Sequence, residues 1–199
     1  MVARRSLIAG GLALAGVLSV AHGAWIPAKA ALAQVLLDQA WRETQRTRAP
    51  TKPWPWADTW PVTKLTAPVQ KKSMVVLAGA NGAAHAFGPG HLRTSAPAGV
   101  SDNSVLAGHR DTHFEFLKNL KLGDSLMLEA IDGRIHEYKV TDLRVVHETD
   151  TRALLPTETA TLTLITCYPF DAIVPGGPLR YVVRAQGITG HNPFLDKKT

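Results

Sequence analysis

The sequence predicts a mainly β domain that forms a closed or nearly closed β-barrel with few short helices, and two features of the pattern support this. From Pro61 onward, short apolar or alternating runs are separated by turn residues. Asp132-Gly133 lies between two of these runs and is a strong signal for a β-hairpin. The predicted strands cover residues 62–65, 74–78, 105–108, 125–129, 135–146, 161–167 and 180–188, and one short helix is predicted over residues 114–120.

The N-terminal segment, residues 1–27, has the layout of a signal anchor. Arg4 and Arg5 precede an almost wholly apolar run over residues 6–21, and residues 24–26 extend this run to about the length of a bilayer span. We therefore predict a single inner-membrane helix, with the catalytic domain on the periplasmic or extracytoplasmic side, because basic residues stay in the cytoplasm. Cleavage of the segment after a small residue is the alternative.

A predicted helix and a linker separate this segment from the β domain. Residues 28–48 carry apolar side chains at helical spacing, which predicts an amphipathic stalk helix. Residues 49–60 contain prolines at a density that prevents a regular helix, and we expect the tryptophans of this linker to dock on the domain surface. The β-barrel is assigned to residues 61–190, and residues 191–199 form a polar tail.

Composition narrows the possible functions. Hydrophobic residues make up 45% of the 199-residue chain and charged residues 19%, which argues against a disordered protein. The net charge of +6 is concentrated in residues 1–50, so no basic stripe in the β domain predicts nucleic-acid binding. The chain has one cysteine, Cys167, which excludes an intramolecular disulfide and a cysteine metal cluster. We predict no metal and no other cofactor.

Cys167 is the candidate nucleophile. It ends the predicted strand over residues 161–167, directly before Tyr168-Pro169, and Pro169 lacks a backbone donor for a β-ladder. A strand end on the rim of a barrel is rigid yet open, which suits a nucleophile. The alternative for a single cysteine is a small buried thiol in the core.

A cysteine nucleophile needs a base or a positive neighbour, since the thiolate is the reactive species. His109 lies at the end of a predicted strand, after Gly108, where the backbone can approach its neighbours closely. His113 follows four residues later and could pair with His109 on a helical turn. Two histidines make a poor metal site, although Asp111 or Glu115 could add a ligand.

Arg180 opens the last predicted strand, just after the loop that leaves Cys167. Hairpin pairing of the two strands would return Arg180 to the same rim, and alternation places Arg184 and Val182 on its face. A guanidinium there could hold a substrate carbonyl or an oxyanion. A surface salt bridge is the alternative role.

Three segments resemble the sortase family. The run TLITC over residues 163–167 matches the family's TLxTC signature, LAGHR over residues 106–110 matches its catalytic histidine segment, and LRYVVRA over residues 179–185 matches the strand that carries its essential arginine. The resemblance covers roughly residues 61–187. The segment over residues 108–124 and the predicted helix that includes residues 36–41 look most like the sortases of Gram-negative bacteria, the class GN sortases.

The resemblance implies a closed eight-stranded sortase-type barrel and a cysteine transpeptidase. Cys167 would attack a C-terminal LPxTG-like sorting signal and form a thioester, His109 would act as general acid and base, and Arg180 would stabilise the oxyanion. Thr166 and Tyr168 flank the nucleophile and would contact substrate, with structural roles as the alternative. The implied partners are a protein that bears the sorting signal and an amine acceptor that the sequence does not identify.

The sequence also bears on calcium binding and on three alternative functions. Some sortases bind calcium, but Glu148, Asp150 and Glu158 match no specific site. An exported cysteine peptidase would hydrolyse the same acyl-enzyme with the same residues. A non-enzymatic envelope β-barrel would instead bury Cys167. An L,D-transpeptidase is disfavoured, because its SHGC-type segment is missing.

Overall fold

The computed structural model describes residues 29–80, 85–172, 174 and 176–188. The predicted membrane segment over residues 1–27 and the predicted tail over residues 191–199 lie outside these residues. None of the helices in the described part of the chain is long and apolar enough to cross a bilayer. The chain divides into two compact units, residues 1–36 and 37–199. In the first unit, residues 29–36 are helical.

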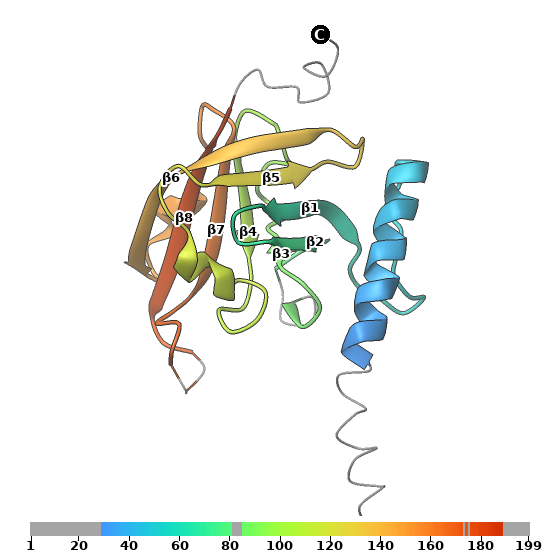
Figure 1. Cartoon of the computed structure of the whole chain (residues 1–199), viewed down its shortest axis with the longest axis horizontal. Helices are drawn as coiled ribbons and strands as arrows, with labels where there is room; N and C mark the ends of the chain where they lie inside the picture. The colour runs from blue at the N-terminus through green and yellow to red at the C-terminus, as the bar shows by residue number, and fades with distance from the viewer. Residues whose placement is uncertain (1–28, 81–84, 173, 175, 189–199) are drawn as a thin grey trace, which may run out of the picture. The chain divides into compact units, whose positions relative to one another are not determined.

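The second unit contains the predicted closed barrel, in which eight strands follow the order β1-β2-β3-β4-β7-β8-β6-β5 (Figure 1). Two short 3₁₀ helices accompany the strands, and the first of them occupies most of the region where a short helix is predicted. The elements are β1 (Pro61–Ala67), β2 (Lys72–Ala78), β3 (Gly90–His91), β4 (Asn103–Ala107), η1 (Glu115–Asn119), β5 (Ser125–Glu129), β6 (Ile135–His147), η2 (Thr151–Leu154), β7 (Thr161–Tyr168) and β8 (Leu179–Gly187).

Every second side chain of a strand points into the barrel and helps to fill its interior. In β7, Leu162 and Leu164 belong to the interior cluster, as do Val183 and Ala185 of β8. Because successive side chains of a strand point to opposite faces, the residues between them lie on the outer face. Burying one leucine of this kind stabilises the fold by about 1.5–3 kcal/mol. The other buried members of the cluster are Leu65, Ala67, Val76, Leu106, Phe114, Phe116, Leu117, Leu120, Leu126, Leu128, Tyr138 and Val140.

Residues 37–47 of the second unit are also helical. Leu37 and Trp41 form a small apolar cluster with Val75 and Leu77 of β2, so the helical residues cover the outer side of that strand. Arg48 follows in the left-handed region with φ 59°, a conformation that often ends a helix.

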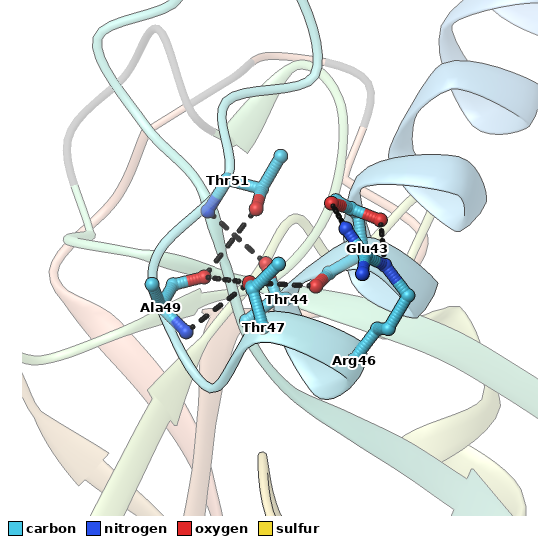
Figure 2. Close-up of polar contacts among 6 residues, drawn as sticks. All are labelled: Glu43, Thr44, Arg46, Thr47, Ala49 and Thr51. Carbon is cyan, nitrogen blue, oxygen red and sulfur yellow. Dashed lines mark hydrogen bonds and ion pairs between the residues drawn. The ribbon is translucent and has the colours of Figure 1, made fainter.

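Hydroxyl groups satisfy backbone atoms where the helical residues end (Figure 2). Thr47 Oγ1 donates to the Glu43 carbonyl at 2.8 Å, and Thr51 N donates to Thr44 Oγ1 at 3.1 Å. Glu43 also forms an ion pair with Arg46 on the exposed side. These contacts fix the direction in which the chain enters the proline-rich segment.

The proline-rich segment docks through two of its three tryptophans. The Trp54 ring lies edge-on to Phe87 with centroids 5.0 Å apart, and the Arg93 guanidinium lies 5.2 Å from the Trp60 ring. The expectation that all the tryptophans dock is wrong for Trp56, which is 83% exposed.

Candidate active site

Cys167 and Arg180 lie opposite each other on neighbouring strands. Cys167 is partly exposed near the end of β7, and the antiparallel β7–β8 ladder pairs it directly with Arg180. Both residues alternate with interior residues of their strands, so both side chains lie on the outer face of the barrel. Directly opposed residues have Cβ atoms about 4.5–5.5 Å apart, which is contact distance. The prediction that hairpin pairing returns Arg180 to the rim of Cys167 is confirmed.

His109 reaches the same edge from β4. This strand runs parallel to β7, with Ala107 opposite Ile165, and Gly108 N donates to the Ile165 carbonyl at 3.2 Å. Continuing this register by two residues places the exposed His109 beside Cys167. Three segments that are far apart in the sequence thus bring His109, Cys167 and Arg180 to one edge of the barrel.

Gly108 permits the turn that carries His109. A Cβ atom added at this position would lie 3.0 Å from the ring of Phe114, which is fully buried in the core. Such a contact is shorter than most packed atoms allow. The close approach of the Gly108 backbone to its neighbours, expected from the sequence, is therefore present. The backbone before His109 is therefore pressed against the core and held in place.

The Arg180 guanidinium is held by three contacts. Its Nη1 donates to the Gly177 carbonyl at 2.7 Å and to the Leu179 carbonyl at 2.9 Å. Its Nη2 donates to a carboxylate oxygen of Glu148 at 2.6 Å. The salt bridge considered as the alternative role of Arg180 is thus present, and it holds the side chain at the edge that carries Cys167.

Of the predicted substrate contacts, Thr166 is buried and Tyr168 is half-buried. Thr166 is buried and donates its hydroxyl hydrogen to the Gly108 carbonyl at 2.7 Å, which ties the nucleophile strand to the histidine loop. Tyr168 stacks on Tyr181 with centroids 6.3 Å apart and lies edge-on to Phe170. These contacts favour the structural roles that the sequence left as the alternative.

Two buried polar residues that the sequence pattern did not single out support the site. Asn103 donates to the carbonyls of Ala153 and Leu155 at 2.9 and 3.0 Å and accepts from Thr163 Oγ1 at 2.7 Å. This anchors the η2 segment next to β4 and β7. The pattern gave no signal for it, because the partners are about fifty residues apart in the sequence.

Arg110 is the second of these residues. It follows His109, is only 7% exposed, and donates from Nη2 to the carbonyls of Ala172 and Val174 at 3.0 Å each. One guanidinium therefore connects the histidine loop with the segment that leaves the nucleophile strand. The resemblance motif includes Arg110, but nothing in the pattern indicated these carbonyl partners.

Two of the three carboxylates considered for calcium are already paired with arginines. Glu148 binds Arg180, and Asp150 binds Arg152 at 2.7 Å. The hydrogen bond from the Arg152 side chain lowers the pKa of Asp150 to about 2. Calcium prefers several unengaged oxygen ligands, so this segment does not fit a calcium site. In the described ranges, no group of three or more His, Cys, Asp or Glu residues is arranged to hold a metal ion.

Two further histidines lie close to His109. The His85 ring packs edge-on against His109 with centroids 5.5 Å apart. Burial lowers the pKa of His85, and the charge of His109 and of His113 lowers it further. Burial also lowers the pKa of His113, followed by the charge of His109, although a hydrogen bond to Ala86 opposes this. A turn over residues 110–114 separates His113 from His109, and the charge of His109 acts on the pKa of His113.

These lowered pKa values predict weaker stability in mild acid. His85, His91 and His113 all have folded-state pKa values below the ordinary 6.5, with burial as the largest cause. As the pH falls through 6.5, the unfolded chain binds protons before the folded one, so the free energy of unfolding decreases. We expect a lower Tm at pH 5.5 than at pH 7.5 at equal ionic strength. An unchanged Tm would show that these histidines titrate alike in both states.

Comparison with known proteins identifies relatives for the described domain. Residues 61–188 match the family model described as Sortase domain, and this range includes His109, Cys167 and Arg180. Sortase D of Bacillus subtilis (strain 168) is 35% identical over 103 residues, which is 51% of this chain and 51% of the relative. The chain therefore matches about half the length of this curated relative.

Solved structures agree with the fold. The Clostridium perfringens Sortase D5 transpeptidase has a TM-score of 0.64 at 20% identity, covering 79% of this chain and 99% of that chain. At this identity the likeness concerns the fold alone. The catalytic domain of B. anthracis SrtD is 34% identical with a TM-score of 0.55, covering 64% of this chain and 87% of that chain.

Proposed function

Since the chain belongs to the sortase family, we propose that it is a cysteine transpeptidase that cleaves a C-terminal LPxTG-like sorting signal and transfers the protein to an amine acceptor at the cell envelope. The observation that carries the proposal is the convergence of Cys167, His109 and Arg180 on one barrel edge, through the β4–β7 and β7–β8 pairings. Residues with the roles of nucleophile, acid–base group and oxyanion donor are thereby brought together.

The proposed reaction has two halves. In the first, the Cys167 thiolate attacks the scissile carbonyl carbon, the amide C–N bond breaks, and His109 gives its proton to the leaving nitrogen. In the second, the acceptor amine attacks the thioester, His109 takes a proton from it, and the thiolate leaves. Arg180 donates hydrogen bonds to the oxyanion of each tetrahedral intermediate.

The substrate groove is proposed to lie on the outer face between β4, β7 and the η2 segment. Asn103 fixes the η2 segment beside these strands, and Leu154 and Leu155 are apolar and exposed there. Exposed apolar side chains alongside the strand that carries the proposed nucleophile suit an apolar residue of a sorting signal.

The position in the cell is also a proposal. We propose that residues 1–27 anchor the protein in the inner membrane and that residues 61–190 form the catalytic domain on the extracytoplasmic side. The segment of residues 28–48, predicted as a stalk, packs on β2 from Leu37 onward, and residues 49–60 are the linker. The basic pair before the apolar run supports this orientation. Washing membranes with carbonate and digesting intact spheroplasts with protease would test it, since an anchored extracytoplasmic domain stays in the pellet and is digested.

Within the family, we propose that the protein is a sortase of the Gram-negative type. The segment over residues 108–124 supports this assignment, whereas the relatives named above are sortases of the D type. The sorting motif that the enzyme prefers decides between the two types. The peptide library described below reads that preference directly.

The experiment that tests the function is mass spectrometry of the full chain in detergent with a library of LPxTG-like peptides. It is run with and without candidate amines, beside Cys167→Ala. We expect a thioester on Cys167 and a peptide joined to the amine. Cleavage without joining, for every amine, would favour the cysteine peptidase instead. A folded protein whose Cys167 resists small alkylating reagents would favour the non-enzymatic barrel, which the partial exposure of Cys167 argues against.

Replacement of Arg180 with alanine is expected to weaken transfer severely. Loss of one oxyanion donor lowers kcat by roughly 10²–10³-fold in comparable sites. Arg152→Ala serves as the matched control, because Arg152 is an exposed arginine paired with Asp150 in the neighbouring segment. Peptide turnover and Tm are measured for both variants. An Arg180→Ala protein with kcat close to that of the wild type would remove Arg180 from the mechanism.

A further inference from the structure

Glu148 holds the start of β8 as well as the Arg180 side chain. It follows the last residue of β6, and its N–H donates to the Pro178 carbonyl at 2.6 Å. This bond continues the β6–β8 ladder one step beyond the pairing of His147 with Leu179. The carboxylate of Glu148 is therefore carried on a backbone that is itself fixed beside Arg180.

The three contacts of Arg180 leave part of its guanidinium available. A guanidinium has five N–H donors, and the Gly177, Leu179 and Glu148 contacts engage both hydrogens of Nη1 and one of Nη2. Among the described residues, the Nε–H and the second Nη2–H have no partner. Glu148 thus fixes the guanidinium while donors remain for a developing oxyanion.

Stability alone does not account for the Glu148–Arg180 pair. The side chains of Arg180 and Glu148 are 27% and 48% exposed. Ion pairs as exposed as this one contribute little to folding, because solvent screens them. What the contact does change is the freedom of a long side chain that would otherwise sample many rotamers beside the nucleophile.

We propose that Glu148 is a positioning residue for the transfer reaction, acting through Arg180. This rests on the proposed function, because the positioned group is the oxyanion donor of that reaction. The Arg180 contact with the oxyanion exists only in the transition state, so loss of its alignment lowers kcat more than it raises KM. A side chain that served only stability would alter Tm instead.

The first test does not depend on turnover. The Nη–H signal of Arg180 is observed by NMR in the full chain in detergent micelles, and it is assigned as the signal that disappears in Arg180→Ala. Because Glu148 accepts from Nη2, we expect Glu148→Ala to shift this signal toward the position of a free arginine, whereas Asp150→Ala leaves it unchanged. Asp150 is the matched control, because it pairs with an arginine in the same segment. An unchanged signal in Glu148→Ala overturns the proposal.

The second test uses kinetics. We expect Glu148→Ala to lower kcat by about 10-fold or more with a nearly constant KM, since small misplacements of a catalytic group have effects of this size. Glu148→Gln, which keeps an acceptor oxygen, recovers part of the loss, and Tm changes little in either variant. In the Arg180→Ala background, Glu148→Ala has no further effect. If Glu148→Ala lowers kcat by the same factor in the Arg180→Ala background, the proposal is overturned. A fall in Tm that parallels the loss in kcat also overturns it.

Discussion

Replacing Cys167 with alanine is expected to abolish both thioester formation and transfer. The thiolate supplies the bond that holds the acyl group, and no other thiol exists in the chain. Loss of a covalent nucleophile lowers kcat by roughly 10⁴-fold or more in comparable enzymes. The measurement is the rate of peptide joining, together with the mass of the intact protein after incubation with peptide.

The fold should survive this change. Cys167 is partly exposed near the end of its strand, so the alanine variant loses few core contacts. Cys167→Ser provides a matched control, because it keeps the size and polarity of the side chain but lacks a readily ionised group. Both variants should retain a Tm close to that of the wild type. Transfer by Cys167→Ala at the wild-type rate would end the proposal that this residue is the nucleophile.

Replacing His109 with alanine is expected to have the second largest effect. In the proposed reaction, His109 donates a proton to the leaving nitrogen and accepts one from the incoming amine, and such acid–base groups contribute about 10²–10⁴-fold. Its side chain is exposed, so the loss in kcat should occur without a comparable loss of stability. The measurement is kcat/KM of the variant and of the wild type, together with the Tm of both proteins.

Chemical rescue sharpens the test of His109. Because the position is exposed, added imidazole can occupy the space that the alanine leaves and carry the same protons. We expect imidazole to restore part of the activity of His109→Ala and none of that of Cys167→Ala. A variant that keeps more than about a tenth of the wild-type rate without imidazole would contradict an acid–base role of conventional size.

The sequence predicts the barrel and the positions of Cys167 and Arg180 on its rim, because both depend on short-range patterns. Alternation in β7 places Leu162 and Leu164 inside, which leaves Cys167 on the outer face by simple counting. The hairpin relation of β7 and β8 then determines the partner of Cys167. The position of His109 required the resemblance, since the parallel pairing of β4 and β7 joins segments that no turn connects.

Other features depend on long-range contacts or on lengths too short to show a pattern. β3 has two residues, which are too few to show any periodicity, so no strand is predicted there. β2 begins at Lys72, two residues before the predicted strand, because its first residues are exposed and carry no apolar signal. The partners of Thr166 and Arg110 lie 58 to 64 residues away. Only the folded chain shows such contacts.

Closure of the barrel restricts how a peptide can be recognised. A sheet with a free edge can accept an extended peptide as an additional strand, and main-chain hydrogen bonds then hold peptides of many sequences. Here the ring of eight strands is closed, and the side of β4 beyond β3 is covered by backbone bonds from Leu92 to Val105 and from Ala96 to Asn103. We therefore expect the proposed sorting signal to be recognised through its side chains, by the loops around the edge that carries Cys167. Grafting those loops between relatives is consequently the direct route to an altered motif preference.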